Sequence, residues 1–411
     1  MTPLICLITP GHVASTPRLV KNADALAGAG YRVHVVSGRN FPPVDPLDEA
    51  IFATARWEHT RVDSRRGAGV FARKLLRFAA RQLLSRTSVH GVGISARAHL
   101  AEAPRIAAAA AEIPAQLYLG HCLGGLPAAA RAARRWSVPY GFDAEDYHDA
   151  ETESALADPA ERAARRELQS ALLPLCVHIT AGSPMIGEKL AETYGVKPLT
   201  LLNVYSLADA PARPVELEAV SAGRPARIYW FSQTIGPSRG LEAVVAILGR
   251  MTTPAELHLR GFVSADYRTR LEGLAREAGL ARPPVFLPPA PPGEMVRLAA
   301  GYDLGLSTEI NEPLSRALCL GNKIFAYLLA GIPQFLSATP AQKAFARELG
   351  PAARVGDLGR PEESARTLDA FLADAGGVAA ARRTAWSLAR ERYCWDVEKE
   401  KLLASIRKIL P

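Results

Sequence analysis

Residues 4–37 read LICLITPGHVASTPRLVKNADALAGAGYRVHVVS. The first six are mostly apolar, as in a buried strand, and the stretch 17–30 places leucine and alanine at helical spacing. Gly28 and Gly30 predict the end of this helix, and a second apolar run, residues 32–37, follows at once. A strand, a helix and a second strand within about 40 residues fit one right-handed crossover between parallel strands.

The same alternation continues along the chain and predicts an α/β fold. Further strand candidates are residues 116–120, 138–142, 176–181, 199–203, 227–232, 256–261, 284–288, 303–308 and 332–336. Because 411 residues exceed one ordinary core, we expect two Rossmann-like domains that face each other across a cleft. We place them at 1–205 and 227–394, with a linker rich in proline and glycine at 206–226 and a final helix at 395–411 that packs back on the first domain.

Composition narrows the class of protein. With 48% hydrophobic and 22% charged residues, the chain resembles soluble globular proteins. It contains no apolar run of about 18 residues, and we interpret its first residues as a strand and not as a signal peptide. Five scattered cysteines favour a reducing compartment, so we expect a cytoplasmic protein with no zinc site. The net charge of +8 favours anionic partners, but no nucleic-acid-binding motif is present.

Ligands of open α/β sheets bind beyond the carboxyl ends of the strands, so the loops there are the first candidates for chemistry. Gly11 and His12 follow the first strand, where glycine allows close approach and a helix N-terminus offers N–H donors. His121 follows a later strand and precedes a glycine pair. Asp143 and Asp146 lie in the acidic segment GFDAEDYH, where they are candidates for hydroxyl binding or base catalysis, or for helix capping. An ordinary turn and a structural histidine are the alternatives for the first two segments.

Two segments of the second half carry candidates for phosphate binding. Residues 231–242 read FSQTIGPSRGLE and join a strand to a helix. Glycine, serine and threonine followed by Arg239 can hold a diphosphate, although the segment is not a P-loop and a plain loop is the alternative. Lys323 opens the apolar helix of NKIFAYLLAGIP, where a lysine opposes the helix dipole unless an anion binds beside it.

Taken together, these segments resemble the family 4-like glycosyltransferases of the GT-B fold over nearly the whole chain. The similarity is carried by STPR at 15–18, GH at 120–121, FDAED at 142–146, TAGS at 180–183, IGPSRGLE at 235–242 and, most specifically, NKIFAYLLAGIP at 322–333. The resemblance implies a retaining transfer from a nucleoside diphosphate sugar to a glycan or lipid-linked acceptor, without a required metal or other cofactor. Cell-surface polysaccharide or glycoconjugate synthesis is the setting that it suggests.

The resemblance also implies roles for residues. Arg239 and Lys323 would neutralise the leaving diphosphate, and His121 would sit beside the reacting sugar as the third catalytic residue. The donor side would consist of Gly11, Ser232, Thr234, Gly236, Glu309 and Asn322. The acceptor side would consist of His12, Arg18, Asp143 and Asp146.

This chain departs from the family pattern at the paired glutamates. Ala326 stands where the family often has glutamate, and Leu318 stands at the partner position. Glu309 and Glu312 are the candidate substitutes, and Gln233 replaces a common glycine. These departures leave two alternatives open: a nucleotide-sugar epimerase of the same fold, and a non-catalytic GT-B partner protein.

Residues 64–86 read SRRGAGVFARKLLRFAARQLLSR and contain seven basic residues and no acidic one. As a helix, this segment separates an apolar face with Phe71, Leu75 and Phe78 from a basic face with Arg73 and Arg77. Such a helix suits peripheral contact with an anionic membrane at its inner face. The alternative is that the apolar face packs on the first domain and the arginines are solvated.

Overall fold

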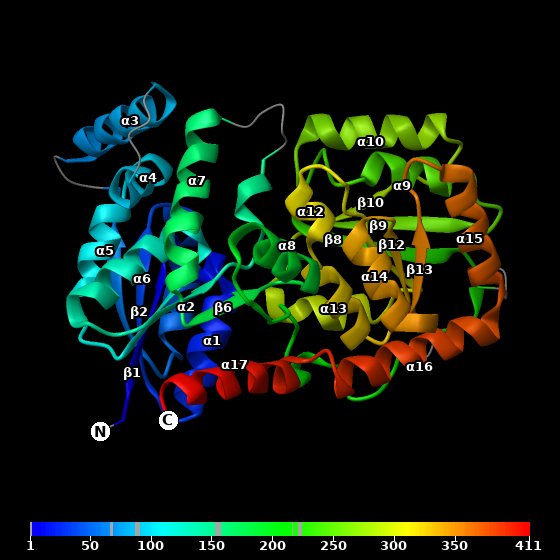
Figure 1. Ribbon diagram of the computed structural model, residues 1–411. Coiled ribbons are helices and arrows are strands. Elements are labelled where there is room, and N and C mark those ends of the chain that lie inside the picture. Colours follow the sequence, from blue (N-terminus) through cyan, green and yellow to red (C-terminus); the bar gives the residue numbers. More distant parts are fainter. Residues whose placement is uncertain (1, 66–68, 87–90, 153–157, 216, 221–223) are drawn as a thin grey trace. The chain divides into compact units, whose positions relative to one another are not determined.

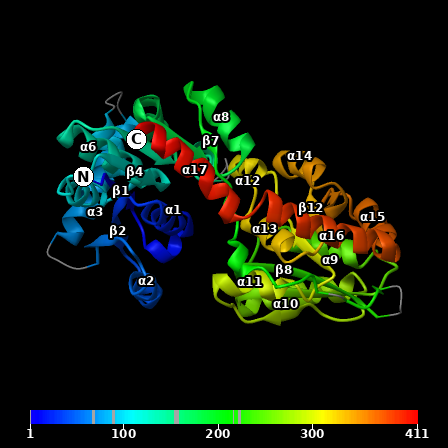
Figure 2. The ribbon, with the colours of Figure 1, turned by 90° about the horizontal axis from the view of Figure 1, so that it is seen from below.

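The computed structural model describes residues 2–65, 69–86, 91–152, 158–215, 217–220 and 224–411 (Figure 1). The chain forms two compact units, one of Met1–Leu201 with Lys399–Pro411 and one of Leu202–Glu398. Residues 206–226, which we predicted as a linker, therefore group with the second unit. The C-terminus marked in Figure 2 belongs to the first unit.

The first unit is built on a parallel sheet whose order is β3-β2-β1-β4-β5-β6-β7. Its strands are β1 (Leu4–Thr9), β2 (Arg32–Arg39), β3 (Glu58–Asp63), β4 (Leu117–His121), β5 (Tyr140–Asp143), β6 (His178–Ala181) and β7 (Leu199–Thr200). Its helices include α1 (Pro17–Gly28), α2 (Asp45–Phe52), α3 (Val70–Arg86), α4 (Val92–His99), α5 (Ala103–Ala111), α6 (Cys122–Trp136), α7 (Pro159–Leu172) and α8 (Pro184–Tyr194). All six residues of β1 are buried, as expected for a central strand covered on both faces.

The second unit contains a six-stranded parallel sheet whose order is β10-β9-β8-β11-β12-β13. Its strands are β8 (Ala226–Ile235), β9 (Ala255–Val263), β10 (Val285–Leu287), β11 (Leu304–Ser307), β12 (Gln334–Ser337) and β13 (Ala353–Gly356). Its helices include α9 (Leu241–Leu248), α10 (Ala265–Glu277), α11 (Met295–Ala299), α12 (Leu314–Leu318), α13 (Asn322–Leu329), α14 (Pro340–Leu349), α15 (Pro361–Ala373) and α16 (Ala375–Glu391). The predicted class, α/β with two Rossmann-like domains, is confirmed.

The last helix, α17 (Trp395–Ile409), begins in the second unit and ends in the first. Within the first unit, Ser405 Oγ lies 2.8 Å from His178 Nδ1, and the Tyr31 hydroxyl donates to Leu410 O at 3.0 Å. The expected return of the C-terminal helix to the first domain is therefore present. Among the described residues, no helix is both long and apolar enough to cross a bilayer.

Candidate functional site

Each sheet has one point where neighbouring strands continue in opposite directions, which is where open α/β sheets bind ligands. In the first unit this point lies between β1 and β4, and in the second unit between β8 and β11. The predicted residues gather at these two edges. Gly11 and His12 follow β1, and His121 is the last residue of β4.

The backbone around His121 is closely packed, because α6 begins directly after β4. A Cβ atom on Gly125 would lie 2.7 Å from the carbonyl oxygen of Ile8, and one on Gly120 would lie 2.7 Å from the backbone of Gly125. Glycine at these positions lets the first turn of α6 sit against both strands. The histidine side chain is consequently fixed at the edge of the sheet, with Cys122 in the left-handed region at φ 54°.

A buried ion pair between Arg18 of α1 and Asp143 of β5 organises this edge. The Arg18 Nε and Nη2 atoms donate to the two Asp143 carboxylate oxygens at 2.9 and 2.6 Å, and Nη1 donates to Leu201 O at 2.6 Å. The Thr180 hydroxyl donates to Asp143 Oδ1 at 2.7 Å. Such bidentate pairs fix geometry as well as charge. Two predicted acceptor-side residues thus meet, and both are buried.

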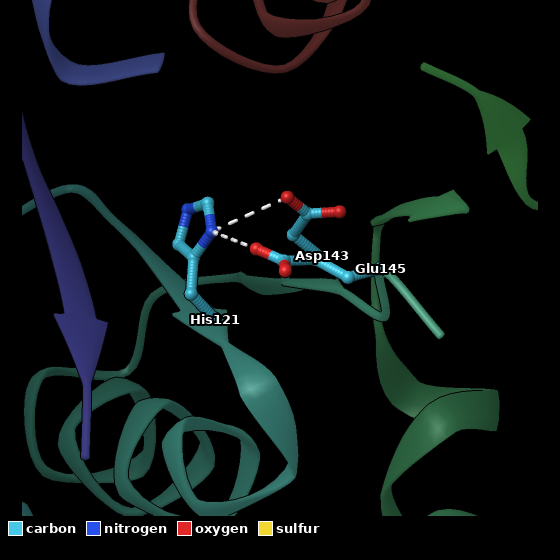
Figure 3. A group of neighbouring side chains, drawn as sticks. All are labelled: His121, Asp143 and Glu145. Atoms are coloured by element: carbon cyan, nitrogen blue, oxygen red, sulfur yellow. Dashed lines mark ion pairs between the residues drawn. The ribbon is translucent and has the colours of Figure 1, made fainter. Parts of the chain in front are cut away.

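His121 joins the same cluster through its ring nitrogen. Nδ1 lies 3.2 Å from Asp143 Oδ2 and 3.9 Å from Glu145 Oε1, and Figure 3 shows both carboxylates converging on it. Burial by itself lowers the pKa of His121, but the Asp143 and Glu145 carboxylates outweigh it and raise the pKa above its ordinary value. Although burial favours the neutral form of Asp143, Arg18 and His121 hold its pKa well below the ordinary range. The cluster therefore favours a charged imidazolium whose Nδ1 faces both carboxylates.

Exposure separates the members of the cluster. The side chain of His121 is 0% exposed, whereas that of Glu145 is 24% exposed. The sequence prediction selected Asp143 and Asp146 from the acidic segment; Asp146 is exposed as a residue, yet burial of its carboxyl raises its pKa to about 6. Glu145 adopts φ 56°, and a Cβ on Gly182 would come within 2.4 Å of its carbonyl oxygen. The Gly182 N–H also donates to Glu145 O at 3.0 Å, so the backbone from which the Glu145 side chain extends toward His121 is held by a crossing that the sequence did not reveal.

His121, Asp143 and Glu145 each offer a ligand atom, and these atoms lie within 4.8 Å of one another. The charge around them opposes a metal ion. Both Asp143 oxygens accept hydrogen bonds from Arg18, and the guanidinium Nε is 3.7 Å from Glu145 Oε1. A divalent cation here would have to displace or repel a buried arginine, so the donor set fits a metal poorly.

His12 and Gly11 have different surroundings. His12 is buried, with Nδ1 2.6 Å from Asp48 Oδ2 and Nε2 accepting from the backbone N–H groups of Asn40 and Phe41 at 3.1 and 2.9 Å. Both ring nitrogens are therefore used to fasten the loop to its neighbours. By contrast, a Cβ on Gly11 would meet nothing within 4 Å, so this loop faces open space.

In the second unit, β8 is longer than predicted. It runs to Ile235, with a register shift between Phe231 and Thr234, so Ser232 and Thr234 belong to the strand and not to the predicted loop. A β-bulge of this kind bends a strand and is common beside functional sites. The true loop before α9 is residues 236–240.

This loop is tied to the end of β11. The Thr308 hydroxyl donates to Arg239 O at 2.6 Å, and the Arg316 guanidinium donates to Ser238 O. Gly240 caps α9 with φ 71°, and a Cβ there would lie 2.7 Å from Thr308 O, so the position requires glycine. The backbone of Arg239 is thus held, whereas its guanidinium has no hydrogen bond or ion pair with the described residues.

Lys323 lies at the start of α13 beside the same edge. Its Nζ is 3.5 Å from Glu309 Oε1 and 5.2 Å from the centre of the Trp230 ring. Sequence reasoning missed Trp230, because a tryptophan in a buried strand carries no functional signal. The backbone of Glu309 is held by the Ser337 hydroxyl at 2.5 Å. The structure therefore brings Lys323 and Glu309 together, while Asn322 is exposed beside them.

The positions that depart from the family pattern have distinct environments. Ala326 is fully buried within α13, and Leu318 is the half-buried last residue of α12. Gln233 and Glu312 are exposed. Among the glutamates offered as substitutes, Glu309 is the one beside Lys323.

Comparison with known proteins gives a fold without a family. No protein-family model matches the chain, and no curated protein matches its sequence. Among solved structures, HepE from Anabaena in complex with UDP and glucose is similar at a TM-score of 0.68, with 15% identity over 99% of this chain and 100% of that one. Sucrose-phosphate synthase from Thermosynechococcus elongatus reaches 0.70 with 14% identity, covering 99% of each chain. A glycosyltransferase from Rickettsia africae reaches 0.69 with 12% identity, over 100% of this chain and 99% of that one. The chain has the GT-B fold.

Proposed function

We propose that this chain is a family 4-like glycosyltransferase that moves a sugar from a nucleoside diphosphate sugar to a glycan or lipid-linked acceptor. The observation that supports the proposal is that Arg239 and Lys323 lie beside the edge between β8 and β11, the kind of edge at which open α/β sheets bind ligands. HepE, a structural neighbour, has been solved with UDP and with UDP-glucose. A diphosphate is the ligand that two such cations suit best.

The donor site follows from the contacts of the second unit. Arg239 has a fixed backbone and an unpaired guanidinium among the described residues, so it can bind a phosphate in a bidentate manner. The Lys323–Glu309 distance of 3.5 Å exceeds that of a charge-assisted hydrogen bond, about 2.7–2.9 Å, and an ammonium has three donors. Lys323 therefore keeps the capacity to bind a second anion. Backbone N–H groups at the start of α9 add to the positive field.

We propose a positioning role for His121 and a ligand-facing role for Glu145. His121 is fully buried, so its charge acts through the carboxylates beside it. Glu145 is the partly exposed member of the cluster, and it is the group that would accept a hydrogen bond from an acceptor hydroxyl. Because Arg18 occupies both oxygens of Asp143, we propose that the reaction needs no metal.

The mechanism that we propose is a retaining transfer in which the diphosphate departs toward Arg239 and Lys323. The bond between the anomeric carbon and the phosphate oxygen breaks, the acceptor oxygen forms the new bond on the same face of the sugar, and the proton of the acceptor hydroxyl passes to the departing phosphate oxygen. Fixed cations at the leaving group lower the barrier, and removing one costs on the order of 3 kcal/mol, or about a hundredfold in rate. We place the reaction in the cytoplasm at the inner face of a membrane, in polysaccharide or glycoconjugate synthesis.

Thermal unfolding with UDP, GDP, ADP, CMP and TDP, each alone and as sugar conjugates, tests the donor site. A ligand at a hundred times its dissociation constant adds about 2.7 kcal/mol to the free energy of unfolding. We expect one nucleotide to stabilise the protein, Lys323→Ala and Arg239→Ala to abolish the shift, and the exposed controls Lys343→Ala and Arg347→Ala to retain it.

The products then decide between the functions. Release of the nucleoside diphosphate only with an acceptor, with the anomeric configuration retained by NMR, supports a retaining transferase. Turnover of the donor without acceptor identifies an epimerase. A folded protein that binds none of the nucleotides refutes the proposal and favours the non-catalytic partner.

A further inference from the structure

Helix α3 carries an unusual exposed apolar face. Phe71, Leu75, Leu76 and Phe78 are 77%, 56%, 47% and 60% exposed, and they account for four of the thirteen exposed large apolar side chains among the described residues. Three of them stand at positions i, i+4 and i+7, which share one side of a helix. Residues 66–68 of the predicted basic segment lie outside the described part of the chain.

The opposite face of α3 is attached to the first unit through its arginines. Arg73 Nε donates to Glu102 at 2.8 Å, Arg77 Nε donates to Ala98 O at 3.0 Å, and Arg81 Nη1 donates to Glu161 at 2.9 Å. Ala80 and Leu84 are buried beneath the helix. Figure 1 shows α3, α4 and α7 side by side. The alternative considered from the sequence, in which the apolar face packs on the first domain and the arginines are solvated, is therefore wrong: the arginines face the protein, and Phe71 and Phe78 face solvent.

The area of this apolar face can be compared with what a second protein or a bilayer would cover. At about 200 Å² for a fully exposed side chain of this size, the four side chains present roughly 500 Å². A stable protein dimer buries about 800 Å² of polar and apolar surface together on each partner, so the apolar face of α3 would make up only part of such an interface. The apolar face falls within the range of the largest apolar patch on a typical monomer, about 300–600 Å², and such patches are often functional. A bilayer requires no complementary shape and accepts a narrow apolar stripe.

Charge completes the argument for a lipid surface. The described part of the segment, residues 69–86, contains no acidic residue. Lys74 and Arg86 are exposed, whereas the arginines of the inner face are paired within the protein. The exposed charges beside the apolar face, Lys74 and Arg86, are therefore positive and few. They suit anionic headgroups, while insertion of the apolar side chains supplies most of the binding.

We propose that α3 inserts Phe71, Leu75, Leu76 and Phe78 into the interfacial layer of a bilayer, with Lys74 and Arg86 against anionic headgroups. The inference rests on the proposed function in one respect only: the helix would hold the enzyme beside a lipid-linked acceptor. Membrane binding itself requires neither nucleotide nor catalysis.

Flotation of the full chain with vesicles tests this proposal. One set of vesicles contains phosphatidylcholine alone, and the other contains equal parts of phosphatidylcholine and phosphatidylglycerol. We expect binding to both, stronger to the anionic set, and a loss of at least tenfold in the double variant Phe71→Ser/Phe78→Ser. The matched control Leu47→Ser/Phe262→Ser, which removes apolar side chains that are 59% and 67% exposed elsewhere, should float like the wild type.

Two further readouts make the result decisive. Lys74→Gln should reduce binding to anionic vesicles and leave binding to neutral vesicles unchanged. The nucleotide-induced thermal shift should be the same in all these variants, so that failure of membrane binding and failure of the donor site are distinguishable. Absence of flotation in the wild type, or flotation that survives loss of both phenylalanines, overturns the proposal. A wild-type dimer that the double variant dissociates, without flotation, assigns the face to a second copy of the chain and also overturns it.

Discussion

Replacing Arg18 with methionine tests whether its ion pair with Asp143 holds the first unit together. The substitution keeps an unbranched apolar stem but removes the donors to both Asp143 oxygens and to Leu201 O. Asp143, which is 3% exposed, would be left with the Thr180 hydroxyl and His121. Breaking a buried pair by removing one partner costs about 3–5 kcal/mol, because the remaining charge stays buried. We expect Arg18→Met to lower the free energy of unfolding by that amount at neutral pH.

The stability difference between the wild type and Arg18→Met should depend on pH. Burial alone would raise the pKa of Asp143, but Arg18 and His121 lower it in the folded protein. A carboxyl whose folded pKa is depressed contributes stability above its unfolded pKa, about 3.9, and loses that contribution as the pH falls toward the folded value. The stability difference between the wild type and Arg18→Met should therefore be largest near pH 7 and narrow below about pH 4.

Urea unfolding followed by circular dichroism measures both effects. Arg131→Met, at an exposed position of α6 in the same unit, is the matched control and should change stability by about 0.5 kcal/mol or less. A loss below about 1 kcal/mol for Arg18→Met, or a difference that does not narrow in acid, would falsify the assignment of a buried, structure-determining ion pair.

Three further predictions concern both edges. The pKa of His121 is raised in the folded state, so its positive charge stabilises the fold below about pH 6.5 and stabilises it less as the pH rises. His121→Gln should therefore lower the free energy of unfolding more at pH 6 than at pH 9. It should also displace the alkaline limb of the pH–rate profile. An unchanged profile would remove the positioning role. Gly240→Ala should cost about 1–3 kcal/mol in urea unfolding because of its positive φ and the contact with Thr308. Gly236→Ala should cost less, because its Cβ would meet only Thr234 Cγ2 at an ordinary 4.0 Å; equal losses would contradict the tight approach at Gly240. Chelation with EDTA should leave the transfer rate unchanged, and a loss that added magnesium restores would show that a metal takes part.

The sequence predicted the central strands of the sheets better than it predicted the outermost strands and the strand ends. Central strands such as β1 carry long apolar runs, because both faces are covered. The missed strands have little such signal: β3 reads EHTRVD and is largely polar, and β13 is only four residues, ARVG. The end of β8 was misplaced because its bulged residues, Gln233 and Thr234, are polar and exposed.

In the candidate site, the sequence identified residues but not their contacts. Arg18 and Asp143 were each selected for their own local sequence, but 125 residues separate them, and only the fold shows that they pair. Glu145 was part of the acidic segment, yet its approach to His121 depends on a backbone crossing with Gly182.

Helix α3 shows why a helical wheel cannot orient a helix. The wheel separates the apolar and basic faces, but the acids that attract the arginines, Glu102 and Glu161, lie in distant segments. Periodicity identifies the two faces of a helix, and only the surrounding protein determines which of them is turned inward.

The division of the chain gives the first unit an unusual order of assembly. Residues 399–411 belong to that unit, yet all of Leu202–Glu398 is synthesised between them and Leu201. At about 5–20 residues per second, a ribosome needs roughly 10–40 s to make the intervening unit. During that interval His178 and Tyr31 lack their partners Ser405 and Leu410 on every growing chain. On the growing chain the surface of the first unit that contacts α17 therefore stays uncovered during that interval, and a chain that stops before residue 399 never covers it.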